Sequence, residues 1–507
     1  MSQQVRANYE SLVKILEELS HLSAVQRLME WDQLVMMPPN GSAARGKQLE
    51  VMAGIDYDKS TNPEIGKLVD SILADANNQS ELDKWEQAVV RDAKRNYDRV
   101  TKLPKELVQR SARLGAEAYE AWVTARKESN FSKFSPFLKQ WVEVRKEQAK
   151  YLDATKDPYD VLIDQYERGV SSPLIDQVFT QLKTALPPLI KAIASKPQPD
   201  RSFLDTKFDV DTQAKLSHAI AKEIGFDTES GRLDVSVHPF STDISSPFDV
   251  RMTTRYKDTD IIEGLTGTIH ETGHSLYEQG RNLKYADLPV SQALSMGIHE
   301  SQSLLWERMV GLSLPFWEKY WPKVLEHFPQ LDKKVTAEQF WKAINTVKPD
   351  FIRVEADELT YPLHIIIRFE IEKDLIGGKI AVDDLPTIWN NKMKEYLGIV
   401  PENDAKGVLQ DTHWSSGSFG YFPTYTLGAI YACQFFKKAE KEIPNLDGLI
   451  RSGNFKPLKE WLNTNIHHKG SLIPSGDLLT KEVTGEGLNP TIFINYLTEK
   501  YSKIYGL

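Results

Sequence analysis

The feature that most constrains this chain is the run His270-Glu271-Thr272-Gly273-His274, an HExxH pattern. Histidines four residues apart lie on one face of an α-helix, so both imidazoles can reach one metal ion if the segment is helical. The glutamate follows the first histidine and stands at the edge of that face, where it can take a proton from a water molecule on the metal. The run therefore predicts a helix that carries a hydrolytic zinc site.

The residues on either side of the run also indicate a helix. Asp260 and Glu263 have the spacing of a capping box at a helix start, and Gly280 is a suitable stop. Apolar residues recur at helical spacing between them and predict one buried stripe: Ile262, Leu265, Ile269 and Leu276. The two histidines fall beside this stripe, so we expect them to face partly inward.

A hydrolytic zinc ion usually has three protein ligands and one open position, so the sequence has to supply a third ligand. Metzincins place a histidine ten residues after the first ligand, but Gly280 stands there, which excludes that class. Glu278 lies eight residues after His270, about 12 Å along the helix, which is too far. His299 and Glu300 open another predicted helix, and only one of them can reach the metal because neighbours point about 100° apart. We choose Glu300.

Two further residues have a functional and an ordinary interpretation. Glu307 lies two turns after Glu300 on the same predicted face and could orient a ligand histidine, although an ordinary buried or surface glutamate is an equally good interpretation. Cys433, the single cysteine, could be a nucleophile, but its apolar neighbours predict a buried helical residue.

Most of the rest of the 507 residues has the composition of a series of α-helices. Long stretches such as 81–128 are rich in Glu, Lys, Leu, Ala and Gln and poor in glycine. The proline-containing breaks at 36–41 and 196–200 are short enough to be turns between helices. We therefore expect a mainly α protein with one domain over residues 1–507, in which a helical wall (about 1–230) precedes the metal and substrate region (about 231–507).

One segment, residues 233–256, departs from this pattern. It alternates and is rich in Val, Ser, Thr and Phe, which predicts a strand-like meander directly before the zinc helix. An edge strand there could bind an extended peptide, and a purely structural hairpin is the alternative. Within it, we expect Arg251 to be structural, held by Asp249 and Thr253.

Composition excludes several classes of partner. The net charge of −9 argues against nucleic acid, because neutralising phosphates requires a basic face. No apolar run approaches the length of a membrane span, and acidic residues interrupt the N-terminal segment, so we expect neither a membrane partner nor a signal peptide. One cysteine cannot form an intramolecular disulfide, and together these features predict a cytosolic protein.

Five blocks of the sequence together resemble the carboxypeptidase Taq family, and they occur in that family's order. They are His238-Pro239-Phe240, Asp249/Arg251/Thr253, the HExxH run with His299-Glu300-Ser301-Gln302, Ile352/Arg353/Ala356/Asp357, and Gly407/Gln410/Asp411/His413/Trp414. The resemblance is good over the C-terminal two-thirds and looser before it. It implies an almost entirely helical fold with a deep groove, a small sheet near the metal, and a homodimer.

The resemblance also implies an activity, namely zinc-dependent release of C-terminal amino acids from peptides with broad side-chain tolerance. Glu300 would be the third zinc ligand, in agreement with the choice made from helix geometry. A His/His/Glu set also accepts cobalt or manganese. Glu271 would act as the general base and return its proton to the leaving amine.

Other residues are candidates to bind the substrate. Tyr425 and His413 could donate hydrogen bonds to the oxyanion, and Tyr421 competes for that role, although core packing is its alternative. A free carboxylate can be held by a guanidinium, and Arg353 in its apolar setting is our choice. The alternatives are a salt bridge from Arg353 to Asp357, four residues later, and an anchor at His238, His413 or Tyr425.

Two other functions stay open at this point. The first is an endo-acting oligopeptidase with the same zinc chemistry and a groove open at both ends. The second is a helical binding protein with a structural zinc ion, which normally needs a fourth protein ligand, commonly cysteine. Cys433 is far from the other ligands in sequence, so the structural site is the weaker alternative.

Overall fold

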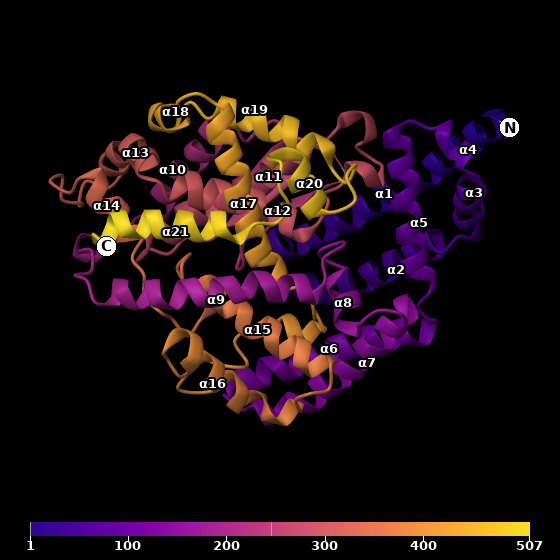
Figure 1. Ribbon diagram of the computed structural model, residues 1–507, viewed down its shortest axis with the longest axis horizontal. Helices are drawn as coiled ribbons and strands as arrows, with labels where there is room; N and C mark the ends of the chain where they lie inside the picture. Colours follow the sequence, from indigo (N-terminus) through magenta and orange to yellow (C-terminus); the bar gives the residue numbers. More distant parts are fainter. Residues whose placement is uncertain (1, 245) are drawn as a thin grey trace.

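The protein is built almost entirely from α-helices, with one small sheet (Figure 1). The computed structural model describes residues 2–244 and 246–507. The N-terminal helices are α1 (Ser2–Val35), α2 (Ser42–Ser60), α3 (Pro63–Leu73), α4 (Ala76–Ser80) and α5 (Lys84–Thr101). They are followed by α6 (Lys105–Lys127), α7 (Ser135–Asp153), α8 (Pro158–Ile163), α9 (Ser172–Ala194) and α10 (Val210–Ile224). The predicted mainly α fold is confirmed.

The first helices form a smaller, separate core at one end of the molecule, to which Tyr285, Leu288 and Val290 also contribute (Figure 1). Leu12 of α1, Val69 and Ile72 of α3 and Val89 of α5 are completely buried in it. A second, much larger core gathers residues from Leu107 to the C-terminus. The change between the two cores therefore falls near residue 100, and the division of the chain near residue 230 stays a prediction.

The three strands are β1 (Gly231–Val235), β2 (Ser241–Asp243) and β3 (Val250–Thr254). Strands were predicted in this region, but the meander is wrong: the order is β1-β3-β2, with β1 parallel to β3 and β2 antiparallel to it. Val250 and Met252 of β3 are completely buried, whereas β1 and β2 are partly exposed. The most buried strand therefore takes the centre of the sheet, although it comes last in sequence.

The sheet packs against α11 (Ile261–Gln279), the helix that carries the HExxH run. Asp260 caps this helix by accepting the backbone N–H groups of Ile262 and Glu263. The predicted capping box also requires the Glu263 carboxylate to accept the backbone N–H of Asp260. That part of the prediction is wrong, because the Glu263 carboxylate pairs with Arg255 and Lys257 instead. Two cations outcompete one backbone N–H for that carboxylate.

The remaining helices complete the large core around α11. They are α12 (Met296–Leu304), α13 (Leu314–His327), α14 (Ala337–Ile344), α15 (Tyr361–Ile376), α16 (Leu385–Leu397), α17 (Pro423–Glu442), α18 (Leu446–Ser452), α19 (Lys456–Asn465), α20 (Gly476–Thr484) and α21 (Pro490–Tyr505). A π-helical segment, Leu305–Gly311, continues α12. Helices α9 and α21 lie side by side across the molecule (Figure 1).

Helix α12 lies between α11 and α17, and a glycine on each neighbour permits this close packing. A Cβ atom on Gly273 of α11 would lie 2.5 Å from the Gln302 carbonyl oxygen and 2.6 Å from the Ser303 Cα. A Cβ atom on Gly428 of α17 would lie 2.9 Å from the Glu300 Cβ. Only glycine allows backbones to approach this closely.

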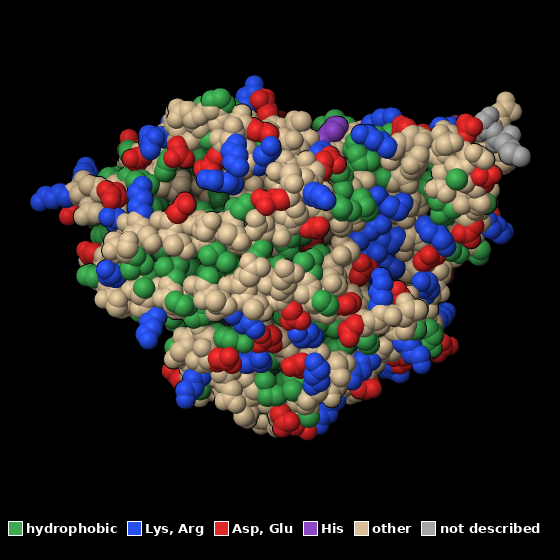
Figure 2. Space-filling model, viewed as in Figure 1, with side chains coloured by type: hydrophobic (Ala, Val, Ile, Leu, Met, Phe, Trp, Pro, Cys, Tyr) green, Lys and Arg blue, Asp and Glu red, His purple; other side chains and the backbone are tan. Residues whose placement is uncertain are grey.

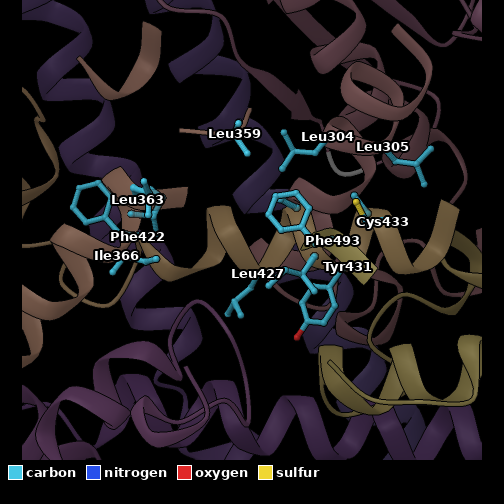
Figure 3. Packing of buried hydrophobic residues seen from close by; sticks show 14 of the residues in the cluster. Leu304, Leu305, Leu359, Leu363, Ile366, Phe422, Leu427, Tyr431, Cys433 and Phe493 are labelled. Atoms are coloured by element: carbon cyan, nitrogen blue, oxygen red, sulfur yellow. The ribbon is translucent and has the colours of Figure 1, made fainter. Parts of the chain in front are cut away.

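Buried side chains from α12, α17 and α21 belong to one core cluster (Figure 3). Leu304, Leu427 and Phe493 are buried there, and Cys433 is buried nearby, as predicted. On the outside, lysine and arginine side chains are mixed with acidic ones over the face shown in Figure 2. Within the described ranges, no helix has both the length and the apolar character needed to cross a membrane.

We predict that Gly273→Ala destabilises the protein by about 1–3 kcal/mol, because the new methyl group has to push two backbones apart. Gly267→Ala on the same helix is the matched control. Its nearest non-local atom would be the Thr254 hydroxyl at 3.7 Å, so it should be neutral or stabilising by up to about 1 kcal/mol. Chemical denaturation of the three proteins measures the difference, and equal stability of the two variants would refute the close-packing explanation.

Candidate active site

Three potential metal ligands meet where α11 faces α12. His270 and His274 come from α11 and Glu300 from α12, and one ligand atom from each lies within 4.8 Å of the others. The Glu300 Oε2 atom is 3.8 Å from His270 Nε2 and 3.4 Å from His274 Nε2. Ligands of a tetrahedral zinc ion with bonds of 2.0–2.1 Å are separated by about 3.3 Å. The three side chains therefore fit one zinc ion after small adjustments.

The charges of the side chains in this cluster also favour a bound cation. Burial opposes a charge on His270, but the carboxylates of Glu300 and Glu307 outweigh it and raise the pKa of His270 to about 10. Burial likewise opposes a charge on Glu300, yet His270 and His274 lower the pKa of Glu300 to about 2. Without a metal, the negative charge of this cluster keeps a proton on His270. A divalent cation bound to the three side chains would replace that proton.

A second layer of side chains orients both histidines. His270 Nδ1 lies 2.7 Å from Glu307 Oε2, so the predicted contact of Glu307 with a histidine is confirmed. His299 does not join the three potential ligands, because its ring lies behind His274, with Nδ1 against His274 Nδ1. Hydrogen bonds of this kind fix the orientation of a metal-binding imidazole.

The contact to His299 continues into a buried relay that the sequence analysis missed. His299 Nε2 is 2.9 Å from Glu278 Oε1, and Arg281 Nη1 donates to Glu278 Oε2 at 2.8 Å and to Asp243 Oδ2 at 3.0 Å. Asp243 also pairs with Arg27 of α1 at 3.3 Å. The spacing of Glu278 and Arg281 indicates a local ion pair, but only the fold shows that it supports a histidine.

Glu271 has the surroundings of a proton acceptor. Its side chain is buried, and its Oε2 atom has no hydrogen-bond partner among the described residues. Burial raises the pKa of Glu271 to about 7, and the charge on Glu300 acts in the same direction. A carboxylate with a pKa near neutrality can both take up and release a proton under ordinary conditions.

Arg353 is buried in a short 3₁₀ turn, Arg353–Glu355, and already has partners. Its Nε donates to Asp411 Oδ1 at 2.9 Å and its Nη1 to the Tyr361 hydroxyl at 2.6 Å. The alternative salt bridge to Asp357 is wrong, because a 3₁₀ turn does not place residues four apart on one face as an α-helix does. Asp357 instead accepts backbone N–H groups, including those of Lys348 and Leu359, both at 3.0 Å.

The structure brings His413, Tyr421 and Tyr425 together beside Arg353. His413 Nε2 is 3.3 Å from the Tyr425 hydroxyl, and the ring centroids of Tyr421 and Tyr425 are 5.4 Å apart. The Arg353 guanidinium lies over the Tyr425 ring at 5.0 Å. Burial lowers the pKa of His413 to about 4, so its imidazole is neutral at neutral pH. Burial and then neighbouring charges, including that of Glu300, raise the pKa of Tyr425, so its hydroxyl keeps its proton.

The other predicted residues lie around this cluster. His238 is exposed in the loop after β1, with its Nδ1 2.9 Å from the Pro239 carbonyl oxygen, and its charge helps to lower the pKa of His413. Arg251 is structural, as predicted, with bonds of 2.8 and 2.9 Å to the Asp249 carboxylate. Thr253 does not hold it, because the Thr253 hydroxyl bonds the Ser236 hydroxyl instead, at 2.7 Å.

Comparison with known proteins decides the family. The model of the carboxypeptidase Taq (M32) metallopeptidase family matches residues 11–501. The chain belongs to this family. It is therefore a peptide hydrolase of a metallocarboxypeptidase family, and the resemblance seen in the five sequence blocks is confirmed.

Individual relatives agree over nearly the full length. Carboxypeptidase 1 of Bacillus subtilis (strain 168) is 42% identical over 97% of this chain and 98% of its own. Thermostable carboxypeptidase 1 of Thermus thermophilus is 39% identical over 99% of each. Among solved structures, the M32 carboxypeptidase of Deinococcus radiodurans R1 has a TM-score of 0.95 at 33% identity, covering 99% of this chain and 100% of its own.

We predict that Glu307→Gln weakens metal binding by about ten- to a hundredfold, because the amide no longer fixes and polarises His270 as the carboxylate does. The measurement is competition for zinc with a chromophoric chelator. Glu263→Gln is the control. Glu263 also pairs with cationic side chains, those of Arg255 and Lys257, but it is not one of the groups that contact the three potential ligands, so this variant should bind metal like the parent. An unchanged affinity in Glu307→Gln would show that the contact is incidental.

Proposed function

We propose that this protein is a zinc carboxypeptidase whose metal is held by His270, His274 and Glu300. The observation that carries the proposal is a set of three potential ligands on two helices, together with Glu271, which follows His270 in sequence and whose Oε2 atom has no hydrogen-bond partner among the described residues. Three protein ligands with one position left for water is the arrangement of a catalytic zinc site. Cobalt is a possible substitute, since the same donor set accepts it.

Zinc, when bound, would act as a Lewis acid toward the scissile carbonyl and make a water molecule acidic enough to lose a proton near neutral pH. Glu271 would accept that proton at its buried carboxylate. It would then pass the proton to the amine of the leaving amino acid. Its pKa of about 7 suits both transfers.

The neighbouring hydroxyl and imidazole groups would act on the oxygen that becomes negative during attack. The Tyr425 hydroxyl keeps its proton and can donate a hydrogen bond, and neutral His413 can orient it from 3.3 Å. Tyr421 would line the same part of the site, where its ring packs against Tyr166 at 5.0 Å. These donors are fixed before the substrate arrives, which is how electrostatic stabilisation lowers a barrier.

Arg353 is the proposed anchor for the substrate's terminal carboxylate, with His238 at the exposed side of the same cluster. Among the described residues, the Arg353 Nη2 atom donates no hydrogen bond, so one arm of the guanidinium is available. Broad side-chain tolerance would follow if recognition rests on this carboxylate rather than on a side-chain pocket. The expected groove, the homodimer and the cytosolic location stay predictions.

A second candidate function is an endo-acting oligopeptidase with the same metal chemistry. It is favoured by one observation, that Asp411 and Tyr361 already bind Arg353. If Arg353 serves only to bind Asp411 and Tyr361, its role is structural. The enzyme would then not need a terminal carboxylate on its substrate. The two functions differ only in this anchor.

We predict that the protein cleaves a peptide with a free C-terminus far better than the same peptide amidated at its C-terminus. Arg353→Ala should lower kcat/KM for the free acid, because the buried carboxylate of the substrate loses its partner. The loss should correspond to about 2–5 kcal/mol of transition-state stabilisation. The variant should leave the already slow amide cleavage unchanged. The measurement compares both substrates with both proteins.

The same four rates separate the alternatives. Equal losses on acid and amide would mean that Arg353 acts only through Asp411, and the anchor would then have to be sought at His238, His413 or Tyr425. Rapid cleavage of the amide by the parent protein would favour the oligopeptidase.

A further inference from the structure

A second cavity lies away from the three potential ligands. Its volume is about 430 Å³, and it is enclosed by residues of α13, α14, α17, α18 and α21 together with the π-helical segment. Figure 2 shows the surface hollowed at this place, between α18 and α21. The size falls in the range of small-molecule sites, about 300–1,000 Å³. None of His270, His274 and Glu300 is among its lining residues.

One lining residue of this cavity is a buried cation, Arg308, whose guanidinium has a ring neighbour but no hydrogen-bond acceptor among the described residues: its Cζ atom lies 5.5 Å from the centre of the Tyr361 ring. Arg308 lines the cavity and is only 6% exposed. Within the described part of the chain, its guanidinium donates no hydrogen bond and lies within 4.0 Å of no carboxylate oxygen, and its Nη1 atom is fully shielded from solvent. A buried charge normally has a partner, because removing it from water is costly.

The acidic residues that act on Arg308 are engaged elsewhere. Glu307 and Glu358 both favour the charge on Arg308. Glu307, however, bonds His270 at 2.7 Å, while Glu358 accepts from the Tyr496 and Tyr501 hydroxyls at 3.1 Å each and from Lys500. Among the described residues, the guanidinium therefore has no carboxylate of its own, and Arg308 is one of the residues that line the cavity.

The rest of the lining suits an apolar body. Apolar side chains line part of the wall, and they come from the π-helical segment, the residue after it, α13, α14, α17 and α21: Met309, Leu312, Leu314, Trp341, Phe436 and Ile492. Basic residues stand among them, and Lys437 pairs with Glu440 at 3.2 Å while Lys503 lies over the Trp341 ring at 5.6 Å. Basic lining residues outnumber acidic ones, so the wall has an excess of positive charge: the basic ones are Arg308, Lys437, Lys441, Lys500 and Lys503, and the acidic ones are Glu440, Asp447 and Glu499.

We propose that this cavity binds an organic anion with an apolar body, such as a medium-chain carboxylate, with its head group on Arg308. The head group would provide the hydrogen-bond acceptors that the guanidinium lacks, and carboxylates match its planar donors well. The chain of the ligand would lie against the apolar side chains of the lining, among them Met309, Trp341 and Ile492. The site is separate from peptide hydrolysis and does not depend on the identity of the metal.

Calorimetric titration of the metal-loaded protein with decanoate tests this site, with decanol as the uncharged probe. One decanoate should bind per chain, and decanol should bind at least about tenfold more weakly, because it cannot use the charge. Arg308→Met keeps an unbranched, flexible side chain but removes the charge, and it should remove this preference. Ile492→Trp fills the cavity from α21 and should abolish binding of both probes, whereas Ile388→Trp, a half-buried isoleucine of α16 outside the cavity, should bind like the parent.

Other outcomes overturn the proposal. Decanoate that still binds to both Arg308→Met and Ile492→Trp would occupy another place, such as the metal site. Equal affinity for decanoate and decanol would show that Arg308 does not select an anion, and absence of binding to the parent would exclude the site. If Arg308→Met fails to fold, the comparison of Ile492→Trp with Ile388→Trp still decides where the ligand binds.

Discussion

The candidate active site depends on the close approach of α11 and α12. Gly273 stands between the two histidines of the HExxH run, and its missing Cβ lets the backbone of Gln302 and Ser303 come within contact of α11. Glu300 precedes those two residues by less than one helical turn, so the same contact delivers its carboxylate to the histidines. Gly428 of α17 presses on Glu300 from the other side. The spacing of the three potential ligands is therefore set by backbone packing rather than by flexible side chains.

Charge pairing then fixes the side chains that surround this contact. His270 is held by Glu307, and His274 by His299, whose own position depends on Glu278. On the opposite side, Asp411 joins Arg353 and Arg368, and these arginines keep its pKa well below the ordinary value in spite of burial. Each buried carboxylate in these networks has a cation or several donors, whereas Glu271 Oε2 has no hydrogen-bond partner among the described residues, and that difference supports the proposal that Glu271 accepts the proton.

The sequence predicts the parts of this arrangement that depend on local geometry. Helical spacing alone indicates that His270 and His274 share a face and that Glu307 follows Glu300 on one side of a helix. The wrong predictions concern choices among partners. Glu263 binds Arg255 and Lys257 rather than a backbone N–H, Asp357 leaves Arg353 to Asp411, and β3 inserts between β1 and β2.

These choices could not be made from the sequence because the competing groups are distant along the chain and meet only after folding. Asp411 lies 58 residues after Arg353, and the relay behind His274 reaches Asp243 and Arg27. The cavity at Arg308 is a similar case, since its walls come from helices that the pattern of apolar residues places in the core without showing how they fit together.

The most direct test of the account is to measure zinc content and turnover of Glu271→Gln side by side. In the proposed mechanism, His270, His274 and Glu300 hold the metal, whereas Glu271 accepts the proton. The variant should therefore retain the zinc content of the parent while kcat falls by about a hundredfold or more, as is usual when a general base is lost. Turnover within a few-fold of the parent at full zinc content would contradict it, because another group would then have to take the proton.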